Sequence, residues 1–414
     1  MNNIVSKTAI SKTLAIVIVA VIVVAAIAVI AYFTLIPKPR EKIKIGVITP
    51  LSPPADYISG KEILNTAQLF VEWMNKQGGV AGRELELVVA DQTLDPGVAI
   101  SHLQRMVTQD KIAGLIGPWE SLVALPVAEA TEKFPTIMFC TFSWTDEITA
   151  NHYKYVFRNG VFSSLTARHA LEFFKAMGWK RIAMLIEESP VGFNYKDAIL
   201  YWKKDVYPDV EVTFTTCALG KADYTPELSK IKAMSPKPEV FIPMVNVPHV
   251  YVIAKQYVEL GFPEMGVKMF CGFDWPTYDP KTFWEAMGKG GVGVMFPSYY
   301  SPHMKLTKIG ENFLKLYKEK YGKDPFIALF WYWDSLTILC KAIEATGSTN
   351  PDTLAKYIEN IEIEGTTGKV KFINDPTPKQ PLWHQWIGMI QYVFEFTEVG
   401  QEPYKAKQIY PSPG

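Results

Sequence analysis

The chain has 414 residues, 42 basic and 42 acidic side chains, and a formal net charge of zero. Its apolar fraction of 48% and charged fraction of 20% exclude a disordered chain, which needs fewer apolar residues or a strong charge excess. A neutral chain also lacks the basic footprint that nucleic-acid binding requires. We therefore expect a folded protein that does not bind nucleic acid.

The apolar residues concentrate near the N-terminus. Residues 13–36 form a run of 24, of which 22 are apolar and none is charged. A helix of this length rises about 36 Å, enough to cross a hydrocarbon core of about 30 Å. The pattern predicts a short tail (1–12), a single-pass transmembrane anchor (13–36) and a proline-rich tether (37–42). A cleaved signal peptide is the alternative, although its apolar region normally has only about 7–15 residues.

From residue 43 onward, strand patterns alternate with helix patterns. We expect strands at 43–48, 85–90, 112–117, 136–140, 181–187, 210–216, 239–245 and 267–271. Helical stripes are expected at about 63–74, 99–107, 163–177, 195–206, 225–234 and 248–260, with another helix ending near 133. This alternation predicts an α/β fold of parallel sheets with helices on both faces. An aromatic, alternating tail at 383–399 is interpreted as a strand or hairpin at a sheet edge.

One open sheet rarely holds so many strands, and the body exceeds a typical single domain. We therefore expect two α/β lobes, with the break near 157–160. Ligands of open α/β sheets bind beyond the carboxyl ends of the strands, and two facing lobes form a cleft that can close by hinge motion. The sequence thus favours a binding protein.

Motifs of catalysis and cofactor binding are missing from the sequence. It has no G-x-G-x-x-G, no G-x-x-x-x-G-K-[ST] and no G-x-S-x-G, and its six histidines are scattered. We therefore expect no enzyme activity, no cofactor and no metal. The cysteines at 140, 217, 271 and 340 form no C-x-x-C pair; buried thiols are favoured over disulfides.

Several motifs in a fixed order resemble a known family. They are IGVITPLS at 45–52, NKQGGVAGR at 75–83 with a strand ending in Asp91, IGPWES at 116–121, YVFR at 155–158, WDS at 333–335 and GTTGKVKF at 365–372. From about residue 42 to 372 the chain resembles the periplasmic-type solute-binding proteins of branched-chain amino acid ABC transporters. The NKQGGVAGR stretch before a strand that ends in aspartate is the most specific of these motifs.

The resemblance implies the type I periplasmic-binding-protein fold, with three hinge crossovers near 157–160, 292–296 and 368–372. The first lobe would combine 43–158 with 293–368, and the second 159–292 with 369–414. The implied partners are a small amino-acid-like ligand and the subunits of an ABC permease. The body would lie on the extracytoplasmic side of the cell membrane, held there by the N-terminal helix.

The resemblance also suggests polar ligand-binding residues. A ligand carboxylate suits hydroxyl groups and backbone N–H groups at a helix start, where the helix dipole favours an anion. Ser121 stands in the family's serine position, and Ser143 and Thr145 lie in the matching loop. Asp274 matches a position where the family often holds an acidic residue, which would pair with a ligand ammonium. A helix cap is the alternative role for Ser121 and a solvated turn for Asp274.

Aromatic residues complete the predicted site. Tyr57 resembles the first-lobe aromatic that packs on the ligand, while Trp119, Trp144 and Trp275 fall in three predicted cleft loops. Tryptophans at such places are also common in cores and between lobes. If they line the cleft, they leave less room for a bulky ligand or stack on a flat or cationic one.

Other readings of the function stay open at this stage. The ligand could be an amide or an aromatic acid in place of an amino acid, because the usual side-chain pocket is altered. The body could be the ectodomain of a sensor with the same fold, although only 12 residues precede the apolar run. An enzyme on the same scaffold would need a catalytic constellation that the sequence does not show.

Overall fold

The computed structural model describes residues 12–35, 41–377 and 381–411, and it divides the chain into two compact units, 1–42 and 43–414. The predicted tail (1–12) and tether (37–42) therefore lie largely outside the described residues. Helix α1 covers Lys12–Leu35, and its described apolar side chains between Leu14 and Ile27 are exposed.

The predicted transmembrane anchor is not supported. Within the part of the chain that the structure describes, no helix is long and apolar enough to cross a membrane. The side chains of residues 28–35 and the whole of residue 36 lie outside that part.

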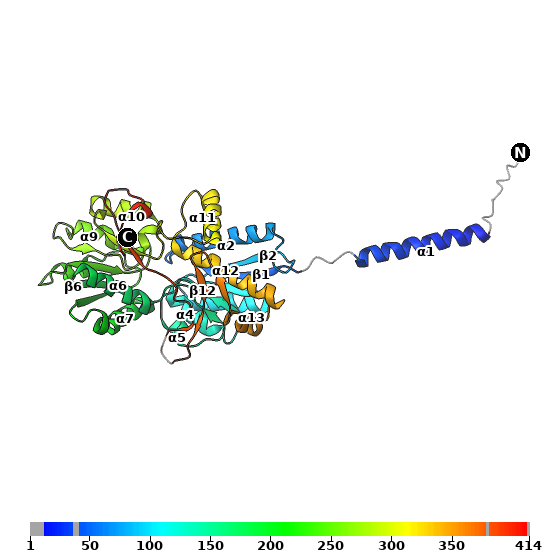
Figure 1. Ribbon diagram of the computed structural model, residues 1–414, viewed down its shortest axis with the longest axis horizontal. Helices are drawn as coiled ribbons and strands as arrows, with labels where there is room; N and C mark the ends of the chain where they lie inside the picture. The colour runs from blue at the N-terminus through cyan, green and yellow to red at the C-terminus, as the bar shows by residue number, and fades with distance from the viewer. Residues whose placement is uncertain (1–11, 36–40, 378–380, 412–414) are drawn as a thin grey trace. The chain divides into compact units, whose positions relative to one another are not determined.

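A five-stranded parallel sheet forms the centre of the first lobe (Figure 1). Its strand order is β2-β1-β3-β4-β5, with bounds Leu85–Asp91, Ile43–Thr49, Gly114–Ile116, Ile137–Phe139 and Val156–Phe157. Strand β1 is almost wholly buried, and neighbouring strands β2 and β3 pair with both of its edges. The helices of this part of the chain are α2 (Tyr57–Lys76), α3 (Pro96–Arg105), α4 (Ser121–Ala130) and α5 (Glu147–Ala150), and a π-helical turn at Met106–Asp110 extends α3.

Three later helices also pack on the first lobe. They are α11 (Lys308–Tyr321), α12 (Ile327–Thr346) and α13 (Pro351–Ile358). Helix α12 packs against both α2 and β3, and most of its side chains are buried. Because α12 is apolar on nearly every face, it lacks the amphipathic stripe by which a helix is recognised in sequence.

A four-stranded parallel sheet forms the centre of the second lobe. Its order is β7-β6-β8-β9, with bounds Glu211–Cys217, Arg181–Glu187, Val240–Met244 and Lys268–Met269. Its helices are α6 (Ser163–Met177), α7 (Pro190–Val206), α8 (Thr225–Lys232), α9 (His249–Glu259) and α10 (Pro280–Met287). Helix α6 and strand β6 match their predicted bounds. Helix α7 begins five residues earlier than predicted, because Ser189 caps it by accepting a hydrogen bond from the Gly192 N–H at 3.4 Å.

Short antiparallel pairs make up the rest of the chain. Strand β10 (Met295–Ser298) forms a sheet with β15 (Tyr392–Glu395) and β16 (Lys407–Tyr410), while β11 (Glu362–Glu364) pairs with β12 (Lys369–Lys371) and β13 (Ile373–Asn374) with β14 (Trp383–Gln385). The tail predicted as a strand or hairpin thus holds two strands in different sheets. Brief 3-10 turns lie at Trp275–Thr277, Gly288–Gly291 and Pro403–Lys405.

Buried residues join the lobes where the chain passes between them. Arg158 follows β5, and its backbone pairs with residues 384–386. Gly160 approaches the Thr141 carbonyl so closely that a Cβ atom would lie 1.7 Å from the oxygen. The exact lobe boundaries stay a prediction.

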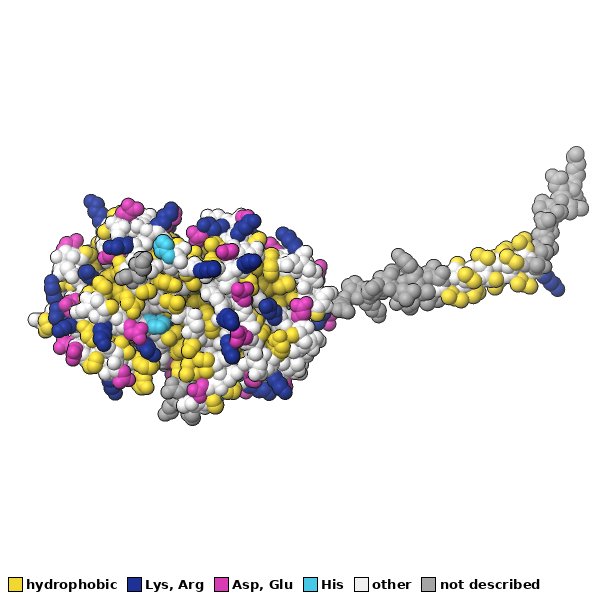
Figure 2. All heavy atoms as spheres, viewed as in Figure 1, with side chains coloured by type: hydrophobic (Ala, Val, Ile, Leu, Met, Phe, Trp, Pro, Cys, Tyr) yellow, Lys and Arg dark blue, Asp and Glu magenta, His cyan; other side chains and the backbone are white. Residues whose placement is uncertain are grey.

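The molecular surface fits the neutral composition. Figure 2 shows acidic and basic side chains interspersed over the visible face of the body. All four cysteines are buried free thiols, as the sequence favoured.

Candidate ligand-binding pocket

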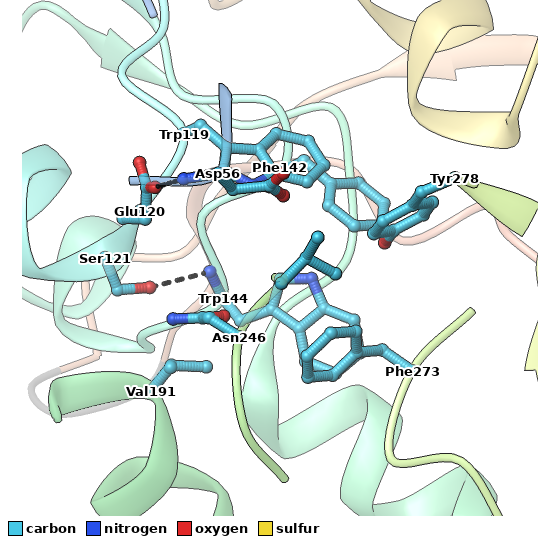
Figure 3. A pocket seen from close by; sticks show the side chains of 11 residues that line it. Asp56, Trp119, Glu120, Ser121, Phe142, Trp144, Val191, Asn246, Phe273 and Tyr278 are labelled. Atoms are coloured by element: carbon cyan, nitrogen blue, oxygen red, sulfur yellow. Dashed lines mark hydrogen bonds between the residues drawn. The ribbon is translucent and has the colours of Figure 1, made fainter. Parts of the chain in front are cut away.

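A pocket lies where strand-end loops of the two lobes meet (Figure 3). The first lobe contributes loops that follow β1, β3 and β4, and the second contributes loops that follow β6, β8 and β9. Its lining consists of Asp56, Trp119, Glu120, Ser121, Phe142, Trp144, Val191, Asn246, Val247, Phe273 and Tyr278. This is the position that open parallel sheets give to their ligands.

The pocket is nearly closed in this structure. Its volume is about 30 Å³, which holds one or two water molecules. Pockets for organic ligands usually measure several hundred Å³, on the order of 300–1,000. An organic solute therefore enters only if the lobes separate, which is the hinge motion that a two-lobed architecture permits.

A constrained turn after β3 carries three of the lining residues. Gly117 adopts φ +93°, and a Cβ atom there would lie 2.1 Å from the Ile48 carbonyl oxygen. Only glycine fits so close to β1 with that backbone angle. The turn places Trp119, Glu120 and Ser121 at the start of α4, where they face the pocket.

Two carboxyl groups lie side by side on the first-lobe wall. Glu120 accepts hydrogen bonds from the Asp56 N–H at 2.7 Å and from the Gln92 amide. Asp56 caps α2 by accepting from the Ser59 N–H at 3.1 Å, and its other oxygen accepts from the Trp119 indole N–H at 3.0 Å. All four of these donors are uncharged, so neither carboxyl group has a basic partner in these contacts.

Burial controls the ionisation of this pair. It raises the pKa of Asp56 from 3.8 to about 6, against the opposing effect of the hydrogen bonds from Ser59 and Trp119. Burial raises the pKa of Glu120 further, to about 8, and the nearby negative charges of Asp56 and Glu187 act in the same direction. Burial and the mutual repulsion of the two groups therefore disfavour two negative charges side by side.

The predicted hydroxyl groups are engaged with the chain itself. Ser121 Oγ accepts from the backbone N–H groups of Trp144 at 3.1 Å and Thr145 at 3.2 Å. Ser143 Oγ donates to the carbonyl oxygens of Pro118 and Trp119 at 3.0 and 2.7 Å. These bonds tie the loop after β4 to the turn after β3, so the hydroxyl groups fix the first-lobe wall.

Arg158 holds the same loop from behind. Its guanidinium is fully buried and donates to the carbonyl oxygens of Ser143 at 3.0 Å and Thr145 at 2.7 Å, to Thr149 at 2.5 Å and to Gln385 at 2.5 Å. Burial lowers its pKa from 12.5 to about 10, which leaves it charged at physiological pH. Arg158 does not line the pocket and acts as a positioning residue.

Aromatic rings cover much of the pocket. Trp119 stacks on Phe142 with an interplanar angle of 7° and centroids 4.8 Å apart, and Phe142 meets Trp144 edge to face. Trp144 in turn contacts Phe273 of the second lobe at 5.5 Å. Tyr278 contacts Trp119 edge to face, with ring centroids 6.1 Å apart. Figure 3 shows these rings around the space between the acidic pair and Val191.

The second-lobe wall has two polar groups, the Asn246 amide and the Tyr278 hydroxyl. The backbone N–H and side-chain amide of Asn246 donate to Glu187 at 3.0 and 3.2 Å. Burial raises the pKa of Glu187, which lies behind Asn246 rather than in the pocket lining. The apolar part of the second-lobe lining comes from Val191, Val247 and Phe273.

The structure brings together some of the residues predicted from sequence. Trp119, Ser121 and Trp144 line the pocket, and Ser143 and Thr145 lie buried in its wall. Three others do not line it: Tyr57, Asp274 and Trp275. Their roles as ligand contacts stay a prediction that this arrangement does not favour.

Each of these three residues faces elsewhere for a local reason. Tyr57 begins α2 and lies in a separate groove with Lys61 and Pro248. Asp274 and Trp275 enter a 3-10 turn that directs both into the interior. Asp274 accepts from the Tyr278 hydroxyl at 2.6 Å, and burial raises its pKa to about 7. Asp274 is thus connected to the pocket only by its hydrogen bond with Tyr278, which lines the pocket.

Asp56 and Glu120 are the main functional residues that sequence reasoning missed. Both stand next to predicted residues, Tyr57 and Ser121. The sequence held a signal for both residues. Each is an acidic residue that lies between the carboxyl end of a strand and the start of the next helix. Phe142, Phe273 and Tyr278 were hidden by the general abundance of aromatic residues, 13% of the chain.

Taken together, the two lobes and the pocket between their strand ends define a bilobal ligand-binding protein. The model of the periplasmic binding protein family matches residues 42–387, so the chain belongs to this family. It is a periplasmic-type solute-binding protein and not an enzyme, and the resemblance seen in its motifs is confirmed.

Curated relatives have names that describe amino acid binding. The "Leu/Ile/Val-binding protein BraC3" of Rhizobium johnstonii is 29% identical over 174 residues, which are 41% of this chain and 46% of that protein. The chain thus aligns with less than half the length of this relative. The "Leucine-, isoleucine-, valine-, threonine-, and alanine-binding protein" of Pseudomonas aeruginosa is 23% identical over 83% of this chain and 89% of its own length.

Solved structures share the fold. A leucine-binding protein from Thermotoga maritima has a TM-score of 0.74 at 22% identity, covering 87% of this chain and 96% of its own. A solute-binding protein from Rhodopseudomonas palustris, solved with 3,4-dihydroxybenzoic acid, has a TM-score of 0.71 at 20% identity, covering 86% and 93%. At these identities the likeness shows the fold alone.

Proposed function

We propose that this chain binds a small organic solute between its lobes and delivers it to an ABC permease. The observation that carries the proposal is the pocket itself, because both lobes contribute lining residues to it. Closure of the lobes on a solute would bury it, and a permease could then recognise the closed form.

We propose that the ligand belongs to one of three chemical classes. Relatives named for branched-chain amino acids support an amino acid, while the neighbour solved with an aromatic acid supports a flat ring. The stacked aromatic walls suit a small solute that presents an apolar face. An amide is the third class that the sequence left open.

We also propose that the N-terminal segment holds the body at the outer face of the membrane. The support is the uncharged run of residues 13–36 in the sequence. Expression of the full chain in bacterial cells, followed by membrane fractionation and protease treatment of intact spheroplasts, tests this. We expect a membrane-bound, protease-accessible body; a freely released body with a new N-terminus would indicate a cleaved signal instead.

Calorimetric titration of the purified full chain tests the central proposal. The panel contains amino acids, amides, aromatic acids and amines, and tryptophan fluorescence reports on Trp119 and Trp144 in the pocket. We expect saturable binding of one chemical class with a fluorescence change. If no panel member binds, the proposal is wrong; if a member is chemically converted, the protein is not a simple binding protein.

A further inference from the structure

The charge of the pocket carries an inference about the solute, which rests on the proposed function. We propose that the solute is a small organic cation, an ammonium or amidinium without a carboxylate, held by Asp56 and Glu120 between the aromatic walls. The pocket and the family define the site, and the acidic pair sets its charge.

The first argument is the missing counter-charge. Among the pocket-lining residues that the structure describes, two are acidic and none is lysine, arginine or histidine. Arg158 is directed away from the acidic pair, because its donors are engaged by two carbonyl groups, Thr149 and Gln385. Carboxyl groups buried without a cation are costly as anions. A cationic solute would supply the charge that the chain does not.

The second argument is that the groups suited to an anion are already engaged. Ser121 Oγ accepts the Trp144 and Thr145 N–H groups, and Ser143 donates to backbone carbonyls. Glu120 stands at the start of α4 without a capping hydrogen bond from its side chain, so the chain places its own acidic residue where a helix dipole would attract a ligand anion. Ser121 is the acceptor in both of its bonds, so a solute carboxylate could accept only its hydroxyl proton and would then face Glu120.

The third argument is the aromatic lining. Cations bind favourably over the faces of tryptophan, tyrosine and phenylalanine rings, most strongly where water is excluded. Trp119, Trp144, Phe142, Phe273 and Tyr278 all line the pocket and are at most 7% exposed. The pocket thus has aromatic rings on several sides and carboxyl groups on one side. This environment suits an organic cation whose remaining atoms are apolar.

Binding of a cation should release a proton from the pair. Glu120 faces Asp56 and Glu187, and the phenol of Tyr332 lies close enough to respond to its charge. Asp56 faces the Trp119 indole and the phenols of Tyr251 and Tyr278. Since no basic group is among these neighbours, an arriving positive charge would favour the ionised form of both carboxyl groups.

Four probes of similar size test the charge preference on the full chain. They are benzylammonium, benzyl alcohol, benzoate and leucine, titrated by calorimetry at pH 7.5. We expect benzylammonium to bind at least 10-fold more tightly than the other three. Tighter binding of benzoate, leucine or benzyl alcohol would overturn the cation proposal and leave solute binding intact. Binding of none would overturn both.

Two variants and one control separate charge from folding. Glu120→Gln and Asp56→Asn should each weaken benzylammonium binding at least 10-fold but change benzyl alcohol binding less than 3-fold. Asp334→Asn is the matched control, because Asp334 is equally buried and also has a raised pKa but lies outside the pocket lining. It should alter neither affinity more than 2-fold. Equal losses for both probes in the pocket variants would contradict the proposal.

The proton count is an independent readout. Benzyltrimethylammonium keeps its charge at every pH, so its titration in two buffers with different ionisation enthalpies measures protons released by the protein. We expect close to one proton released at pH 7 and tighter binding at pH 8 than at pH 6. No release, together with pH-independent affinity, would show that the pair does not hold the cation.

Discussion

The two walls of the pocket differ in chemistry. The first-lobe wall carries the acidic pair, Ser121 and three aromatic rings, and a hydrogen-bond network fixes their positions. The second-lobe wall contributes Val191, Val247 and Phe273, with Asn246 and the Tyr278 hydroxyl as its polar groups. Under the proposed function, the first lobe recognises the solute charge, while the second lobe excludes water and completes the enclosure.

The largest expected effect concerns the support of the first-lobe wall. Arg158→Ala would leave the carbonyl groups of Ser143 and Thr145 buried without their donors and open a cavity behind the loop. We expect the free energy of unfolding to fall by about 3–5 kcal/mol. Urea unfolding followed by circular dichroism measures it.

The matched control is Arg168→Ala. Arg168 forms an exposed pair with Glu172 at 3.0 Å, four residues along the same helix. Surface pairs of this kind contribute under about 1 kcal/mol. If both arginine variants cost the same free energy, the first-lobe wall does not depend on Arg158.

The acidic pair predicts how stability depends on pH. The folded pKa of Glu120, about 8, exceeds its unfolded value of 4.5, and that of Asp56, about 6, exceeds 3.8. The folded protein therefore binds more protons than the unfolded chain, and this stabilisation is complete below about pH 4 and lost as pH rises through 6 to 8. Over the range in which only the folded form holds a given proton, each pH unit lowers the free energy of unfolding by about 1.4 kcal/mol.

Thermal melting of the solute-free protein at pH 5 to 8.5 measures how its stability changes with pH. Asp274 and Asp334 have pKa values raised in the same direction, so a slope from them persists in any variant. Glu120→Gln should flatten the curve relative to the unsubstituted chain. An unchanged slope in this variant would mean that Glu120 is ionised in the folded protein.

A smaller effect is expected where the second lobe contacts the first. Asn194 of α7 donates to both carboxylate oxygens of Glu147 at 3.1 Å and accepts from the Asp146 N–H at 2.9 Å. Asn194→Ala removes bonds that join the two lobes in this nearly closed arrangement. We expect solute affinity to fall about 5- to 10-fold, by roughly 1–1.5 kcal/mol, through a shift toward open forms.

Small-angle scattering of the solute-free variant should show a larger radius of gyration. Asn151→Ala provides the control, since the Asn151 amide bonds Tyr153 within the first lobe. Lower affinity in Asn194→Ala with unchanged scattering would point to a local effect on the loop that holds Glu147.

The smallest effect is expected at Tyr57. This side chain lies in a groove outside the pocket, so Tyr57→Ala should change solute affinity less than 2-fold. Tyr278→Ala, an aromatic deletion in the pocket lining, should weaken binding by more than 10-fold. Calorimetry on both variants distinguishes the two positions, and a large loss at Tyr57 would restore the role that the sequence suggested.

Much of the fold could be predicted because it depends on local pattern. The strands at 43–49 and 181–187 and the helix at 163–177 lie within a residue of expectation, since their periodicity directly reflects one buried face. Helix α10 and helix α11 were missed. Helix α10 has only eight residues, while α12 is buried on nearly all sides, which obscures its stripe.

The candidate site was predicted to the level of loops but not of side chains. Asp56 and Tyr57 are adjacent, yet only Asp56 faces the pocket. Asp56 precedes the helix with a non-helical backbone, whereas Tyr57 is the first helical residue, so their side chains point in different directions. The cap that Asp56 makes to Ser59 fixes which one turns inward. A shift of one residue in that helix start would exchange their positions.

The sequence alone determined that this is a neutral, folded α/β protein with the motifs of a solute-binding family. Those properties depend on composition, periodicity and residue order, which need no knowledge of distant contacts. Only the tertiary structure decided that Asp56 and Glu120 meet, that Asp274 is directed inward, and that the hydroxyl groups are engaged by backbone. The first and last of these depend on residues tens of positions apart, because hydrogen bonds and burial across strand ends decide which side chain the pocket receives.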